Sequence, residues 1–229
     1  LEKKLLVYII FLIINSFYIF LDFYIILVLS FKLNCNSYLS FYEKKIILFP
    51  GRLTSWKGHE MFIEALNKFK QKNPDKLFFV IILGSDQGRK IYKKKIQRLV
   101  EQYRLIKDVL FIEHCKNMPL AYKISDIVVN CAIEPEAFGR VAVEAQAMEK
   151  VILASNLGGA KETIVDNKTG FLFKANDTND LSNKLSHIFQ LDETTLKSMG
   201  NEGRKNAINK FNVEKMCFST YSEYKKLIK

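Results

Sequence analysis

The sequence has few of the side chains from which metal centres and disulfide frameworks are built. Its 229 residues include four cysteines and three histidines. No two cysteines are close in sequence, which excludes a zinc ribbon, a thioredoxin-type pair and a disulfide-rich domain, and indicates a reducing compartment. The reducing compartment predicts a cytoplasmic protein, and the equally scattered histidines predict no metal site and no metal cofactor. The cysteines are Cys35, Cys115, Cys131 and Cys217, and the histidines are His59, His114 and His187.

A nucleic-acid-binding motif is also missing, although the chain is strongly basic. Its net charge is +11 and its pI is near 9.4, a balance that favours anionic partners such as nucleic acid, anionic lipid and nucleotide phosphates. The densest cations lie between residues 89 and 98 and alternate with apolar residues at helical spacing. That pattern is typical of a solvated helix face, and we expect no nucleic-acid partner.

Glycine, alanine and proline are absent from residues 1–48, which are rich in Phe, Tyr, Ile, Leu and Asn. The composition becomes that of an ordinary globular domain from Pro50 onward. We therefore expect two parts, a hydrophobic segment over residues 1–44 and a domain over residues 45–229. The second part has the length of a single α/β domain, since domains commonly run to about 100–200 residues.

Three interpretations of residues 1–44 compete. A transmembrane helix needs about 20 apolar residues, and residues 5–21 carry no charge, although Asp22 then interrupts the run. A signal peptide is disfavoured because the stretch is long and has no small-x-small cleavage site. Translated AT-rich flanking DNA would have the same composition and would imply a truncated or split gene. The first and third stay open, and the first predicts association with the inner face of the membrane.

From residue 45 onward, short apolar runs alternate with amphipathic stretches, as in a parallel sheet flanked by helices. One apolar stripe comprises Met61, Phe62, Ala65, Leu66 and Phe69. We predict a doubly wound, Rossmann-like α/β domain, in which ligands bind beyond the carboxyl ends of the strands. The predicted strands are 45–50, 77–83, 109–113, 127–131, 151–154 and 171–173. The predicted helices are near 61–69, 89–104, 117–125, 138–149 and 212–228. A further helix is predicted to begin at an N-cap, Asp177, and to run through Phe189.

The loop after the first predicted strand has the sequence PGRLTSWKG, which has the features of an anion-binding site. Gly51 ends the strand, Arg52 and Lys57 supply two cations, and a helix opens just after Gly58. Free N–H groups at a helix start and fixed positive charge together suit a diphosphate. The alternative is a basic surface turn. The order of residues excludes a Walker A loop.

A second loop, Gly84 to Gly88, also follows a strand and is by itself no more than a tight turn. No strand is followed by a G-x-G-x-x-G turn, and this disfavours a NAD-dependent dehydrogenase, the main alternative on the same fold.

The third loop, EPEAFGRVAVE, places Glu136 before a predicted helix and Glu144 inside it. The rest of that helix is small and apolar, so we expect it to be buried, and a buried carboxylate needs hydrogen-bond donors. Sugar hydroxyls are suitable donors, two of which one carboxylate can accept. The alternative is a surface ion pair between Arg140 and Glu144 at i,i+4 spacing.

These loops, in this order, resemble glycosyltransferase family 4. The resemblance rests on GRL with WKG, on EPEAFGRVAVE, on VILASNLGGAKETI and on NKTGFLF, and it covers residues 45–229. The sequence EAFGRVAVEAQAM most resembles those of bacterial enzymes that build envelope glycans such as lipopolysaccharide. Members have the GT-B architecture of two facing Rossmann-like domains, and the C-terminal one binds the sugar nucleotide. They transfer a hexose with retention of configuration and generally need no metal.

By position, the resemblance implies a role for each loop. Arg52 and Lys57 would neutralise the diphosphate, and Glu136 would hold hydroxyls of the donor sugar. Glu144 would accept from the ribose hydroxyls. The remaining implied contacts are the backbone N–H groups of Phe138 and Gly139 beside the sugar, Gly51 and Gly84 close to the nucleotide, and the stretch around His114 and Cys115 beside the base.

The chain departs from the family in one large respect, because residues 1–44 cannot supply the acceptor-binding domain that precedes the donor domain. The final helix, about 212–228, normally crosses back onto that domain. Three hypotheses follow: a retaining transferase that works with a separate acceptor-domain chain, a nucleotide-sugar-binding module without transfer, and a membrane-tethered remnant of a split gene. The intact donor loops disfavour the third.

Overall fold

The computed structural model of the protein describes residues 44–228. The chain divides between Lys44 and Lys45, and the interpretations of the segment before that point lie outside the described residues. Over residues 44–228, no helix is long and apolar enough to cross a membrane.

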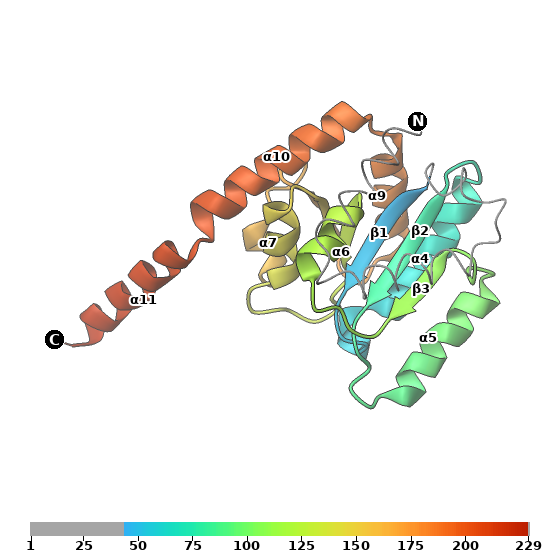
Figure 1. The fold of residues 1–229 in the computed structure, drawn as a ribbon, viewed down its shortest axis with the longest axis horizontal. Coiled ribbons are helices and arrows are strands. Elements are labelled where there is room, and N and C mark those ends of the chain that lie inside the picture. The colour runs from blue at the N-terminus through green and yellow to red at the C-terminus, as the bar shows by residue number, and fades with distance from the viewer. Residues whose placement is uncertain (1–43, 229) are drawn as a thin grey trace, which may run out of the picture. The chain divides into compact units, whose positions relative to one another are not determined.

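Six parallel strands form one sheet in the order β3-β2-β1-β4-β5-β6. This is the order of a doubly wound Rossmann-type sheet, so the predicted fold class is confirmed. Figure 1 shows β3, β2 and β1 side by side. The order reverses between β1 and β4, whose carboxyl ends flank the crevice in which such sheets bind ligands. The strands are β1 (Lys45–Pro50), β2 (Phe78–Leu83), β3 (Val109–Ile112), β4 (Ile127–Asn130), β5 (Val151–Ser155) and β6 (Phe171–Phe173).

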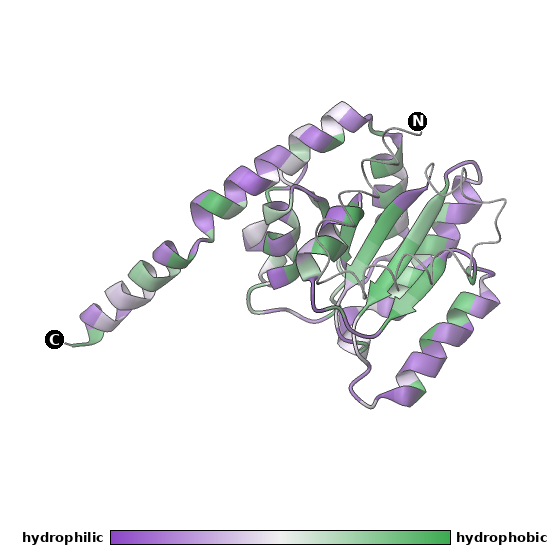
Figure 2. Cartoon of the chain, viewed as in Figure 1, coloured by the Kyte–Doolittle hydropathy of each residue, from purple (hydrophilic) through white to green (hydrophobic). Residues whose placement is uncertain are grey.

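Helices on both faces bury the strands, which explains why the strands read as continuous apolar runs. All six residues of β2 are buried, and Figure 2 shows a hydrophobic sheet beside the largely hydrophilic helix α5. The helices are the 3-10 turn η2 (Ser55–Lys57), α4 (His59–Lys72), α5 (Lys90–Gln102), α6 (Met118–Ile124), α7 (Arg140–Ala147), α8 (Ala160–Thr163), α9 (Thr178–Gln190), α10 (Glu193–Lys210) and α11 (Val213–Leu227).

The apolar stripe predicted on the first long helix faces the core. Phe62, Leu66 and Phe69 of α4 are fully buried, and the Phe69 ring lies 4.7 Å from that of Phe189 on α9. Met61 is only partly buried and packs at the rim.

The C-terminal helices begin where polar caps place them. The Asp177 side chain accepts from the backbone N–H groups of Asn179 and Asp180, as predicted for the start of α9. In contrast, α11 has no buried residue, and the predicted contact of this helix with an acceptor domain stays a prediction.

Candidate functional site

Two loops at the carboxyl ends of β1 and β4 come together to form the candidate site. Residues 51–58 follow β1, and residues 131–139 follow β4, its neighbour in the sheet. The Ile133 N–H donates to the Trp56 carbonyl at 2.8 Å, which ties the two loops to each other.

Lys57 and Glu136, two residues singled out in the sequence for different parts of a ligand, meet at this junction. Their side chains form an ion pair although 79 positions separate them. Only 10% of the Lys57 side chain and 14% of the Glu136 side chain are exposed, so water screens the pair poorly. The Lys57 ammonium also lies 4.5 Å from the Trp56 ring centroid, over a π face that attracts cations.

Asn130 is a third member of this cluster, and the sequence analysis missed it. It is the last residue of β4, it is 3% exposed, and its amide donates to the second oxygen of Glu136 at 2.6 Å. The available signal was a single polar residue at the end of an otherwise apolar strand. Lys57 and Asn130 together fix the Glu136 carboxylate on both of its oxygens.

Glycines let the two loops approach so closely. Gly58 has φ 75°, and a Cβ there would lie 2.0 Å from the Cys131 carbonyl oxygen. Its backbone therefore touches the β4 loop where no side chain fits.

The Gly158-Gly159 pair supports the same loop from the other side. A Cβ on Gly158 would lie 2.6 Å from backbone atoms of Glu136, and one on Gly159 would lie 2.4 Å from those of Phe138. The Gly159 N–H also donates to the Glu136 carbonyl at 2.8 Å. These contacts give a physical reason for the glycines that follow β5.

Gly51 and Gly84 pack on each other rather than standing apart. A Cβ on Gly84 would lie 1.9 Å from the Gly51 carbonyl oxygen, whereas one on Gly51 would meet only the Lys57 stem at 3.6 Å. Chain packing therefore accounts for Gly84, and the predicted closeness of both glycines to a nucleotide stays a prediction.

Arg52 is exposed and lies beside Trp56, with its guanidinium carbon 5.9 Å from the ring centroid. Both predicted cations thus flank one indole ring. Within residues 44–228, Arg52 forms no hydrogen bond or ion pair with Glu136 or Glu144, so its part in the site depends on a ligand.

Glu144 is less buried than the sequence pattern predicted. The buried stripe of α7 consists of Ala142, Ala145 and Gln146, and the Glu144 side chain is 36% exposed. Burial of the helix therefore does not by itself require a ligand for this carboxylate. The alternative contact is present, because Arg140 donates to Oε1 from Nε at 3.2 Å and from a terminal nitrogen at 2.9 Å.

The second oxygen of Glu144 has a different partner. The Tyr122 hydroxyl, on α6, donates to Oε2 at 2.7 Å. Tyr122 is 2% exposed, and burial, together with the hydrogen bond to Glu144, raises the pKa of its hydroxyl far above the ordinary value. It is therefore a permanent donor.

Phe138 and Gly139 lie at the start of α7. Gly139 is its N-cap, with φ 73°, so the helix begins at Arg140 rather than at the predicted 138. Within residues 44–228, the backbone N–H groups of Phe138 and Gly139 have no hydrogen-bond acceptor. The two N–H groups and the helix start form an arrangement suited to an anion.

His114 and Cys115 follow β3, where the sequence placed them; the Cys115 thiol donates to the Asn117 carbonyl at 3.2 Å. Their place beside a base stays a prediction. No group of three or more His, Cys, Asp or Glu within residues 44–228 is arranged to hold a metal ion.

His59 is fully buried directly behind the first loop. Its ring stacks on Phe49 with centroids 4.4 Å apart, and Nδ1 donates to the Thr54 carbonyl at 3.4 Å. Burial, together with the charge of Lys57, lowers the pKa of His59 to about 4 against the upward effect of the Thr54 hydrogen bond.

Because the pKa of His59 is lower in the folded than in the unfolded state, acid favours unfolding. We expect the free energy of unfolding to fall between pH 6.5 and 4 by about 3 kcal/mol from this group and then to level off. Urea titrations across this range should show the loss in the wild type and in His187→Gln, whose histidine is exposed, and a flatter profile in His59→Gln. An unchanged profile in His59→Gln would contradict this account.

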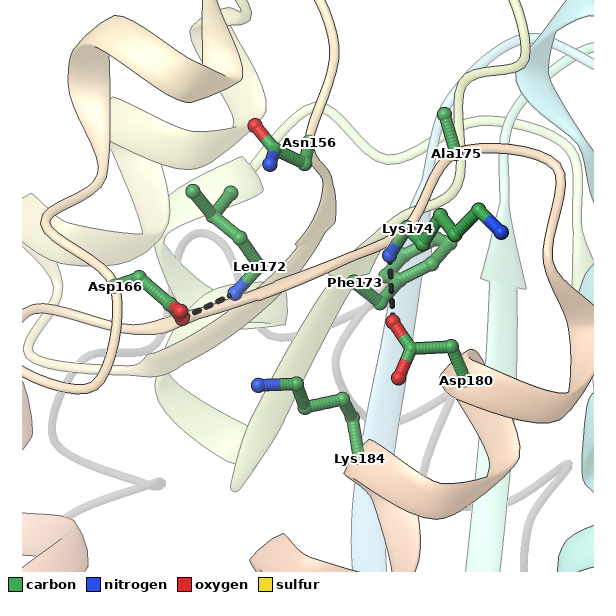
Figure 3. Close-up of a pocket in the computed structure, with 8 residues that line it drawn as sticks. All are labelled: Asn156, Asp166, Leu172, Phe173, Lys174, Ala175, Asp180 and Lys184. Atoms are coloured by element: carbon green, nitrogen blue, oxygen red, sulfur yellow. Dashed lines mark hydrogen bonds between the residues drawn. The ribbon is translucent and has the colours of Figure 1, made fainter.

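A cavity of about 540 Å³ lies along the edge strand β6 (Figure 3), and none of its lining residues belongs to the loops that follow β1 and β4. Its two carboxylates are already engaged: Asp166 accepts from the Leu172 N–H at 2.8 Å and Asp180 from the Lys174 N–H at 2.6 Å. The two carboxylates accept hydrogen bonds from outward N–H groups at the sheet edge. Because these groups are then occupied, the edge is protected against pairing with another strand. We interpret this cavity as part of that edge and not as the binding site.

Comparisons with known proteins identify the family and the fold. The family described as "Glycosyl transferases group 1" matches residues 33–206. A D-inositol 3-phosphate glycosyltransferase of Paenarthrobacter aurescens is 32% identical over 156 residues, which cover 67% of this chain and 37% of that protein. The chain thus spans well under half of that relative.

Two solved structures have the same fold. A glycosyltransferase from Rickettsia africae is 34% identical, with a TM-score of 0.75 over 81% of this chain and 48% of that chain. HepE of Anabaena, solved in complex with UDP and glucose, has a TM-score of 0.73 at 23% identity, over 85% of this chain and 52% of that chain. The second similarity is one of fold alone.

Proposed function

Because the chain belongs to the group 1 glycosyl transferases, we propose that residues 45–229 bind the nucleoside-diphosphate sugar from which a hexosyl group is transferred. The cluster of Lys57, Glu136 and Asn130 carries this proposal. A buried cation and a partly buried carboxylate, fixed at the crevice between β1 and β4, offer one group for phosphate and one for sugar hydroxyls.

The diphosphate end of the donor fits the first loop and the start of α7. Negative charge on the diphosphate grows as the bond to the sugar breaks, and preorganised donors lower the barrier when they face that charge. Lys57, Arg52 and the N–H groups of Phe138 and Gly139 are those donors. Lys57 is poorly solvated, so its charge acts more strongly than that of an exposed lysine.

The sugar and ribose ends use the two carboxylates. Glu136 is held by Lys57 and Asn130 and has lone pairs left for sugar hydroxyls. Glu144 accepts the ribose hydroxyls after Arg140, whose side chain is 83% exposed, leaves Oε1. An exposed ion pair of this kind is worth little and yields readily.

Several finer features belong to the same proposal. Transfer proceeds with retention of configuration and without a metal or other cofactor. A separate chain that carries an acceptor-binding domain is a partner in the same proposal. The product is an envelope glycan, and the protein works in the cytoplasm at the inner face of the membrane. A chain that binds the donor without transferring it is the alternative.

Calorimetric titration of the full chain with UDP, GDP, ADP and UDP-glucose tests donor binding. UDP is the first probe because the HepE structure contains it. We expect one diphosphate to bind and its hexose conjugate to bind about tenfold more tightly, the worth of one hydrogen bond to a charged group. Glu136→Gln should abolish that tenfold difference and leave the diphosphate affinity in place.

Glu162→Gln, an exposed carboxylate on α8, is the matched control and should keep the difference. Failure of all three diphosphates to bind would refute the proposed function. Incubation with labelled UDP-glucose and a chain containing an acceptor domain then separates transfer from binding alone.

A further inference from the structure

Tyr122 and Arg140 hold the Glu144 carboxylate in different ways. Arg140 reaches Oε1 from the surface, with 83% of its side chain exposed. Tyr122 reaches Oε2 from the interior, 2% exposed, at 2.7 Å. A ligand can displace the first partner from the surface, whereas the second is held in the interior.

The position of Tyr122 is itself fixed. It lies in the short helix α6, and the Ser125 hydroxyl, 1% exposed, donates to the Tyr122 carbonyl at 2.8 Å. The hydroxyl therefore reaches Glu144 from a constrained backbone. Burial, together with the hydrogen bond to Glu144, raises the pKa of the Tyr122 hydroxyl far above the ordinary value, so the hydroxyl is a donor at neutral pH.

We infer that Tyr122 is a positioning residue that orients Glu144 to accept a vicinal diol, and that this contact makes the site prefer ribonucleotides to 2′-deoxyribonucleotides. The inference rests on the proposed function, in which Glu144 meets the ribose.

The chemistry of a carboxylate supports this role. Its two oxygens offer about four acceptor positions. The Tyr122 hydroxyl occupies one on Oε2 and restrains rotation of the carboxylate plane, so the remaining positions face outward in a constant direction once Arg140 moves. Without the hydroxyl, Glu144 is free to follow Arg140 into solvent, and the two hydroxyls of a ribose no longer find a prearranged acceptor pair.

Calorimetry with UDP and with 2′-deoxy-UDP tests the inference on the full chain. We expect the wild type to bind UDP about tenfold more tightly than 2′-deoxy-UDP, and Tyr122→Phe to reduce this preference to about twofold or less. Affinity for inorganic pyrophosphate should not change, because the phosphate groups do not contact Glu144. Glu144→Gln should lose the preference as well, and the double variant should lose no more than either single one.

Tyr92→Phe is the matched control, since it also removes one buried tyrosine hydroxyl, and it should keep the tenfold preference. A Tyr122→Phe chain that retains the preference while binding UDP would overturn this inference alone. A wild type that binds no diphosphate would overturn the proposed function and this inference together.

Discussion

Lys57→Met is expected to lower the affinity for UDP by about 100-fold, equivalent to about 2.7 kcal/mol. The substitution preserves much of the buried stem over Gly51 and removes the cation. A poorly solvated charge that hydrogen-bonds a phosphate contributes more than an exposed one. Titration calorimetry against UDP measures the change.

Two further variants make this result specific. Lys94→Met removes an exposed lysine on α5 and should leave UDP affinity unchanged. Lys57→Met alone also leaves the buried Glu136 carboxylate without its cation, which destabilises the fold. Adding Glu136→Gln should restore the free energy of unfolding without restoring UDP binding. Recovery of binding in that double variant would show that Lys57 acts only through Glu136.

Gly58→Ala is expected to lower the free energy of unfolding by about 3–5 kcal/mol, in the range of severe backbone substitutions. The added Cβ would meet the Cys131 carbonyl oxygen at 2.0 Å in a residue with φ 75°. The β1 loop would have to move away from the β4 loop, which separates Lys57 from Glu136. Chemical denaturation measures the loss, and UDP binding should fall with it.

Gly88→Ala separates the two causes. Gly88 has φ 83°, but a Cβ there would meet nothing within 4 Å. Gly88→Ala should therefore lower the free energy of unfolding by only about 1 kcal/mol, the cost of placing alanine in the left-handed backbone conformation. Equal losses in the two variants would mean that the contact with Cys131 does not matter.

The sequence predicted most of the fold because its signals are local. Each strand in the middle of the sheet is buried on both faces, so it appears as an apolar run, and the α4 stripe follows the helical period. Asp177 marks the start of α9 through hydrogen bonds to residues two and three positions later. Such contacts lie within a few residues of one another, and the residue pattern reveals them.

The site was predictable in part for the same reason. The carboxyl ends of neighbouring parallel strands meet at one edge of the sheet, so the loops after β1 and β4 had to be neighbours once the strand order was right. The structure brings Lys57 and Glu136 together, and their roles toward a ligand stay predictions. Within the described residues, Arg52 forms no hydrogen bond or ion pair with either Glu136 or Glu144.

The sequence by itself determined the doubly wound sheet, the two loops that approach each other and the residue types within them. Only the tertiary structure decided that Asn130 holds Glu136, that Tyr122 holds Glu144 and that Glu144 is half-exposed. The physical reason is that a hydrogen bond between side chains on different elements depends on the direction in which each side chain leaves its backbone. Packing of the whole domain sets that direction, and spacing along the chain does not record it.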